Sequence, residues 1–189
     1  MIKLFNSKFN NKSILTAKKF FLSGQIYTGY QVQKLETNLL KFFKKKKEVV
    51  AASDLSNAMF LLLKACNIKE NDEILVASFN CLSSTTSIVN IGAKPVWVDL
   101  NKNYPEMSLS DCEKKINKKT KALILYHVAG YPSQTIKFKN FCKKKKIIFI
   151  EDINNSFGSE IDNCRVGDNS DYSILSFYPN RQLASINGA

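Results

Sequence analysis

The sequence predicts an α/β protein in which a mostly parallel sheet lies between two layers of helices. From residue 49 onward, short β-branched runs alternate with longer stretches whose apolar residues recur at helical spacing. The strand candidates are apolar throughout, which is typical of strands that are covered on both faces. These two observations together favour a three-layer, doubly wound sheet.

The elements follow in a regular order after an N-terminal helix at residues 30–47, which a turn at Thr28 and Gly29 precedes. Six runs are strand candidates: residues 49–52, 74–77, 95–98, 122–126, 147–150 and 172–177. Four helices are expected between them: residues 55–66, 81–91, 109–116 and 133–146. We expect residues 1–48 to form an arm and helix, and residues 49–189 to form the sheet domain.

The composition is that of a globular protein: of 189 residues, 44% are hydrophobic. The longest apolar runs are much shorter than the roughly 20 residues that a membrane-spanning helix needs, and there is no secretory signal pattern. The chain has five widely spaced cysteines and no metal-binding pair. We expect a cytoplasmic protein with reduced thiols and no metal.

The net charge of +12 is consistent with an anionic partner such as nucleic acid, a lipid surface or a nucleotide-linked substrate. Much of the charge lies in two lysine runs, residues 44–47 and 143–146, each at the end of a predicted helix. Cations interact favourably with the dipole at a helix C-terminus. Because no nucleic-acid-binding motif is present, we expect neither nucleic acid nor a membrane as partner. A basic anion-binding module without catalysis is the non-enzymatic alternative.

Ligands of parallel α/β sheets bind beyond the carboxyl ends of the strands, so polar residues after apolar runs are candidates for a site. Asp152 follows one such run. A carboxylate there can hold a pyridine nitrogen protonated, although a turn residue at a strand end has the same pattern. Ser53 and Asp54 precede a helix, where they form either an anion site or a plain helix cap.

Three further candidates follow predicted strands. Cys81 lies in a segment rich in hydroxyl and amide groups, residues 78–83. Ser176 and the nearby Arg181 can together hold a phosphate, or simply mark the end of a core strand. His127 is either a ligand contact or a structural histidine whose hydrogen bonds are satisfied within the protein.

Several motifs occur in a recognisable order. They are Thr28-Gly29, Asn71-Asp72-Glu73-Ile74, Gly92-Ala93-Lys94-Pro95-Val96, His127-Val128-Ala129-Gly130-Tyr131-Pro132, Glu151-Asp152 with Asn155, Arg165-Val166-Gly167 and Ser176-Phe177-Tyr178-Pro179. In order and spacing, residues 23–189 resemble the first half of the DegT/StrS sugar aminotransferase family. The resemblance implies a truncated large domain of a fold-type I transferase that depends on pyridoxal phosphate (PLP), without the family's small C-terminal domain.

The resemblance also implies a function. It implies an enzyme that usually forms a homodimer and uses PLP to transfer an amino group from glutamate to a nucleotide-linked keto-sugar. The products of such enzymes are built into surface polysaccharides or antibiotic sugars. In this chain the resemblance implies that Asp152 pairs with the pyridine nitrogen and that Ser176 contacts the cofactor phosphate. Asn155 stands where the family usually has a glutamine near the ring hydroxyl.

Three places depart from the family pattern. Arg181 stands where the family has the lysine that forms a Schiff base with the cofactor, and a guanidinium is neither a nucleophile nor a base at working pH. Ser53, Asp54 and Leu55 replace a Ser-Gly-Thr phosphate cup, and the Asp54 carboxylate would repel an anion. Cys81 replaces a stacking aromatic ring. These departures predict weak or lost PLP binding. They also leave open an alternative to a working aminotransferase, namely a truncated, catalytically inactive relative.

Overall fold

The computed structural model describes residues 9–24, 29–43 and 48–189, which belong to two compact units, Met1–Ala51 and Ala52–Ala189. The first unit contains the helices α1 (Asn11–Ser23) and α2 (Tyr30–Phe42). The helix expected at residues 30–47 is confirmed as far as residue 42, while Thr28 and residues 44–47 lie outside the described residues.

Helix α1 was not predicted, because lysines interrupt its apolar pattern. Its ends nevertheless have recognisable caps. The side chain of Asn10 accepts a hydrogen bond from the backbone N–H of Ser13, and Gly24 ends the helix in a left-handed conformation at φ 72°. None of the side chains of α1 is buried.

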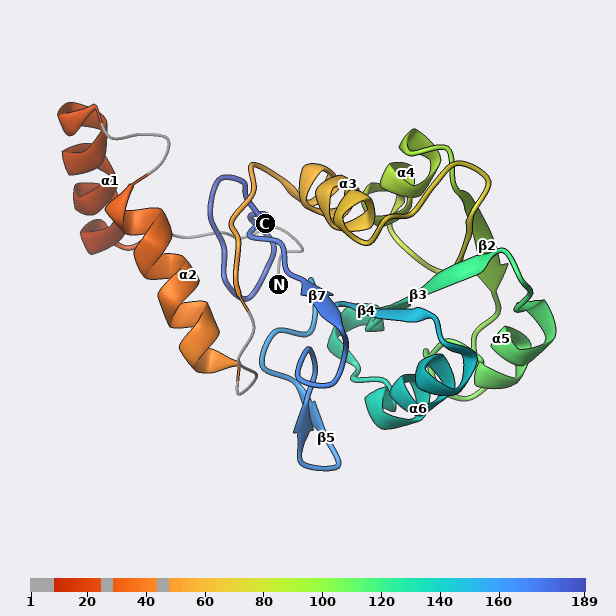
Figure 1. Cartoon of the computed structure of the whole chain (residues 1–189). Helices are drawn as coiled ribbons and strands as arrows, with labels where there is room; N and C mark the ends of the chain where they lie inside the picture. Colours follow the sequence, from red (N-terminus) through yellow and green to blue (C-terminus); the bar gives the residue numbers. More distant parts are fainter. Residues whose placement is uncertain (1–8, 25–28, 44–47) are drawn as a thin grey trace. The chain divides into compact units, whose positions relative to one another are not determined.

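The second unit is built on a five-stranded parallel sheet in the order β2-β1-β3-β4-β7 (Figure 1). The strands are β1 (Glu73–Ala77), β2 (Lys94–Val98), β3 (Thr120–Tyr126), β4 (Ile148–Asp152) and β7 (Tyr172–Ile174). Five of the six predicted strands are therefore confirmed.

The strand predicted at residues 49–52 is wrong. This segment is apolar, yet Val50 is 78% exposed and the segment joins no strand of the sheet. Ala52 instead exchanges two backbone hydrogen bonds with Ala189, at 2.8 and 3.1 Å. A β-branched run predicts an extended backbone, but a strand also needs a neighbour to pair with.

Two helical layers cover the sheet, as predicted (Figure 1). Helices α3 (Leu55–Ala65) and α4 (Leu82–Asn90) lie on one face, and α5 (Leu109–Lys115) and α6 (Thr135–Lys145) on the other. Successive strand residues point to opposite faces, so Val76 belongs to the core under α3 and α4, whereas Leu75 belongs to the core under α5 and α6. The lysine run at 143–146 ends α6, as expected.

Three short elements lie between β3 and β7. A 3-10 turn, η1 (Val128–Gly130), follows β3, and a small antiparallel hairpin joins β5 (Glu160–Ile161) to β6 (Cys164–Arg165). The two residues at the hairpin tip, Asp162 and Asn163, both have positive φ, which is the geometry of a tight two-residue turn. None of these three was predicted.

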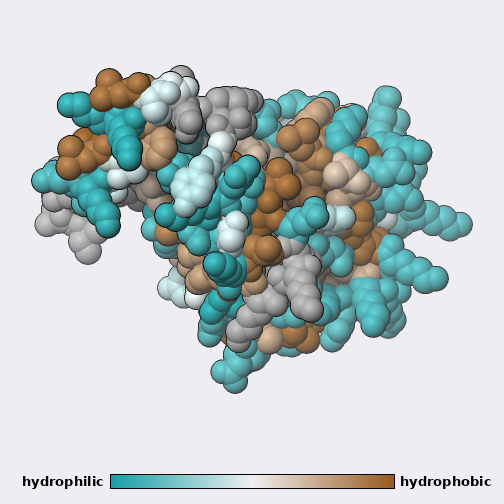
Figure 2. All heavy atoms as spheres, turned by 60° about the vertical axis from the view of Figure 1, so that its left-hand side comes forward, coloured by the Kyte–Doolittle hydropathy of each residue, from teal (hydrophilic) through white to brown (hydrophobic). Residues whose placement is uncertain are grey.

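Hydrophilic side chains cover most of the face that Figure 2 shows, with apolar groups scattered among them. In the described part of the chain, every helix is too short or too polar to span a bilayer.

Candidate functional site

The carboxyl ends of the parallel strands gather most of the candidate residues. Asp152 is the last residue of β4, His127 follows β3 directly, and Ser176 follows β7 by two positions. Because β4 lies between β3 and β7 in the sheet, these three segments end side by side. Helix α4 begins nearby, after β1.

Asp152 is fully buried in this edge of the sheet. Its Oδ2 accepts a hydrogen bond of 2.6 Å from the Ser84 hydroxyl of α4, and its Oδ1 accepts one of 3.1 Å from the backbone N–H of Asn154. Burial raises the pKa of Asp152, and the two hydrogen bonds only partly oppose this effect. A positive group on a ligand would offset the cost of burying the Asp152 carboxylate.

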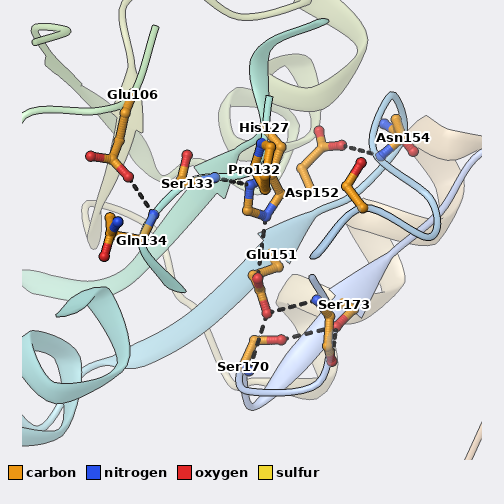
Figure 3. A network of polar contacts seen from close by, with 12 residues as sticks. Glu106, His127, Pro132, Ser133, Gln134, Glu151, Asp152, Asn154, Ser170 and Ser173 are labelled. Atoms are coloured by element: carbon orange, nitrogen blue, oxygen red, sulfur yellow. Dashed lines mark hydrogen bonds and ion pairs between the residues drawn. The ribbon is translucent and has the colours of Figure 1, made fainter. Parts of the chain in front are cut away.

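Glu151 is also fully buried, and its side chain is held by protein groups at both oxygens (Figure 3). Oε1 lies 3.2 Å from Nε2 of His127, and Oε2 accepts from the backbone N–H groups of Gly167 and Ser170 at 3.1 and 3.2 Å. Burial is the largest influence and acts to raise the pKa of Glu151. The hydrogen bonds from His127, Ser170 and Gly167 together outweigh it and lower the pKa.

His127 is fully buried as well. Its Nδ1 accepts a hydrogen bond of 3.0 Å from the backbone N–H of Ser133, so the ring proton is on Nε2 and points to Glu151. Since both ring nitrogens have protein partners, the geometry favours the structural interpretation of His127 over the ligand contact.

Arg181 and Asn155 are joined in a polar cluster. Nη1 of Arg181 donates to Oδ1 of Asn155, and Nδ2 of Asn155 donates to the hydroxyl of Tyr126 at the end of β3. The side-chain amide of Gln182 donates to the carbonyl oxygen of Asn155 at 2.6 Å. Nε of Arg181 is buried and has no hydrogen-bond partner among the described residues.

Tyr126 shows how closely the candidates are grouped. Burial raises the pKa of Tyr126, as does the charge of Asp152, while the hydrogen bond with Asn155 and the charge of Arg181 lower it. The structure thus places Asp152, Asn155 and Arg181 around one tyrosine that sequence reasoning did not single out.

The residues of the predicted phosphate cup form a helix cap. Oδ1 of Asp54 accepts from the backbone N–H of Asn57 at 2.9 Å at the start of α3. Nδ2 of Asn57 donates to the Ser53 hydroxyl at 2.9 Å and to Oδ2 of Asp54 at 2.7 Å, and Leu55 is buried in the core. The plain-cap interpretation therefore accounts for Asp54.

The cap nevertheless lies close to Ser176. Residues 188 and 189 connect them, because Gly188 accepts from Phe177 and Ala189 pairs with Ala52. Ser176 is 3% exposed, and its hydroxyl accepts from the backbone N–H of Tyr178 at 3.2 Å. Its own proton remains available to an anion beside the N-terminus of α3.

Cys81 is the N-cap residue of α4, and its exposed side chain makes no capping hydrogen bond. The Ser83 hydroxyl lies 3.1 Å from its sulfur. The first N–H groups of α4 are thus left without a side-chain cap at the same edge of the sheet as Asp152.

Comparison with known proteins decides the family. Residues 8–189 match the sequence model of the DegT/DnrJ/EryC1/StrS aminotransferase family. The chain belongs to this family. Among curated relatives of this family, the GDP-perosamine synthase of Escherichia coli O157:H7 is 33% identical over 163 residues, and that of Vibrio cholerae 30% over 160. Both alignments cover 85% of this chain but only 44% and 43% of the relatives, so the chain spans less than half their length.

Solved structures share the fold of this chain. The aminotransferase from Psychrobacter cryohalolentis superposes with a TM-score of 0.90 at 24% identity, over 97% of this chain and 48% of that one. The GDP-4-keto-6-deoxy-D-mannose-3-dehydratase of Escherichia coli, solved with bound hydrated PLP, gives 0.89 at 22%, over 100% and 50%. The predicted fold, part of a fold-type I large domain, is confirmed.

Proposed function

We propose that this chain is the cofactor-binding half of a nucleotide-sugar aminotransferase of surface polysaccharide biosynthesis, and that it holds PLP without a covalent bond. Family membership supports the following activity for the whole enzyme of which this chain would be half: a cytoplasmic homodimer transfers an amino group from glutamate to a nucleotide-linked keto-sugar. The observation that carries the proposal is the buried carboxylate of Asp152 at the carboxyl edge of the sheet, beside Asn155 and Arg181.

The polar groups at this edge fit the ring and phosphate of PLP. Asp152 would hold the proton of the pyridine nitrogen, which would offset the desolvation of its carboxylate. The hydroxyl of Ser176 and the N-terminus of α3 would hold the phosphate. The buried, unpartnered Nε–H of Arg181 calls for an acceptor oxygen, which an anionic ligand brings.

The side chain at position 181 does not fit the chemistry of amino transfer. When bound, PLP supplies an electron sink for chemistry at the carbon that carries the amino group. Asp152 would keep the ring nitrogen protonated, and Asn155 and Tyr126 would fix the ring hydroxyl. Arg181, however, stays protonated, so it can neither bond to the aldehyde nor move a proton at the reacting carbon. Binding without turnover is the activity that these residues support.

The experiment that tests this proposal is titration of the purified chain with PLP, followed by borohydride reduction and mass spectrometry of the peptide that contains residue 181. We expect reversible binding that dialysis removes, no adduct at Arg181, and an adduct at this position in the matched variant Arg181→Lys. Absence of PLP binding, or a reduced adduct at Arg181 itself, would refute the proposal.

A further inference from the structure

We propose that Arg181 makes the site select its ligand by the charge of one substituent, the group at the ring carbon that carries the aldehyde in PLP. The preferred order is carboxylate, then aldehyde, then ammonium. This inference rests on the proposed function, because it assumes that a pyridoxal-type ring occupies the site. It goes further by naming the ligand class that position 181 favours.

The guanidinium of Arg181 is held in place from several sides. Nη1 donates to Asn155, and the backbone N–H donates to the carbonyl of Tyr178 at 2.9 Å. Asn155 is itself fixed by Tyr126 through its side chain and by Gln182 through its carbonyl. The positive charge therefore cannot turn away from the site without breaking this cluster.

No carboxylate neutralises this charge directly. In the part of the chain that the structure describes, Arg181 forms no ion pair, and Asp152 has both oxygens committed to Ser84 and Asn154. Arg181 thus brings a permanent charge and, at Nε, a buried donor without a partner. The donor requires an acceptor oxygen, and the charge favours an oxygen that is negatively charged.

The chemistry of the substituent sets the order. A guanidinium binds a carboxylate through two parallel hydrogen bonds, and it repels an ammonium group at short range. A neutral aldehyde gains one weaker hydrogen bond. A lysine at position 181 would instead favour the aldehyde, since only the aldehyde bonds covalently to an amine. Arginine consequently inverts the selectivity that a lysine would produce.

Three ligands that differ only at this carbon test the inference. Their dissociation constants are measured on the full chain by fluorescence titration: 4-pyridoxic acid 5′-phosphate, PLP and pyridoxamine 5′-phosphate. We expect each step of the order to weaken binding on the order of tenfold at low salt. Raising the salt concentration should narrow the differences, because Arg181 is only partly buried.

Two matched variants separate the possible outcomes. Arg181→Gln keeps a donor to Asn155 but removes the charge, so the three constants should converge, whereas Arg181→Lys should make PLP the tightest ligand. Pyridoxamine phosphate binding to the unmodified chain as tightly as the carboxylate would overturn the inference and leave the proposed function standing. Failure of all three ligands to bind would overturn both.

Discussion

Two consecutive carboxylates of β4 have opposite environments. Glu151 and Asp152 are both fully buried and lie 1 position apart, on opposite faces of the same strand. Glu151 is bonded to His127, Gly167 and Ser170, and its pKa is lowered in spite of burial. Asp152 has fewer donors, and burial raises its pKa.

The difference shows how one strand serves two purposes. The protein itself supplies the donors that the Glu151 carboxylate needs, so this residue joins β4 to the segments after β3 and β6 (Figure 3). The charge of Asp152 is left only partly compensated. A buried group in that state is a candidate for binding a ligand, whereas a fully compensated group is structural.

The largest expected effect is on stability, from Glu151→Gln. An amide has one acceptor oxygen, so its NH2 group would face either the N–H groups of Gly167 and Ser170 or the Nε2–H of His127, and we expect a loss of about 3–5 kcal/mol in the free energy of unfolding. Urea denaturation of the purified variant measures this loss. A change below about 1 kcal/mol would show that the two carboxylates are not different in the way described.

Asp152→Asn is the matched control at the neighbouring position. Removing a partly compensated buried charge should leave stability unchanged or slightly higher, while PLP binding weakens by on the order of tenfold or more. Denaturation and PLP titration of the same sample separate the two effects. Equal losses of stability in both variants would contradict the distinction between them.

Ser84→Ala sharpens the comparison at the bond that stabilises Asp152. Loss of the 2.6 Å hydrogen bond should cost about 1 kcal/mol of stability and raise the pKa of Asp152 further. PLP binding should weaken as the pH falls, and in Ser84→Ala this weakening should begin at a higher pH than in the unmodified chain. A pH profile identical to that of the unmodified chain would mean that Ser84 does not act on Asp152.

The smallest effect concerns pH and stability. Because the folded pKa of Glu151 is below its ordinary value of 4.5, this group stabilises the fold above pH 4.5, and the contribution is lost as pH falls through the folded pKa. The contribution of Asp152 to stability has the opposite sign. Because its folded pKa is raised above 3.8, its buried charge destabilises the fold at higher pH, and this cost disappears when the carboxylate is protonated at low pH. Urea midpoints between pH 3 and 7 should therefore depend less on pH in Glu151→Gln and more in Asp152→Asn.

The sequence predicts the parts of this molecule that depend on local pattern. Apolar runs identify β1, β3 and β4 because both faces of these strands are covered, and Asp152 is conspicuous as a carboxylate at a strand end. The run at residues 49–52 misleads, since sequence does not show whether a neighbouring strand exists. The hairpin of β5 and β6 is missed because strands of two residues have no periodicity.

Local sequence patterns do not predict contacts between residues that are far apart in the chain. Ser84 lies 68 positions from Asp152, and Tyr126 lies 29 positions from Asn155, so neither partner is visible before the sheet is assembled. The role of Glu151 was not anticipated for the same reason: its donors come from two separate segments, one after β3 and one after β6. Resemblance to the family supplied Asn155, and the strand-end pattern had already supplied Arg181, but only the structure reveals their mutual contact.

The alternation of Glu151 and Asp152 also constrains how this gene can change. Deleting or inserting one codon ahead of Glu151 in β4 would turn every later side chain of the strand to the opposite face, so each carboxylate would lose its own partners. An insertion would direct Glu151 toward Ser84, whereas a deletion would direct Asp152, with its shorter side chain, toward His127. A substitution in β4 affects either the scaffold, at Glu151, or the site, at Asp152, but a change in the length of β4 would disrupt both in a single event.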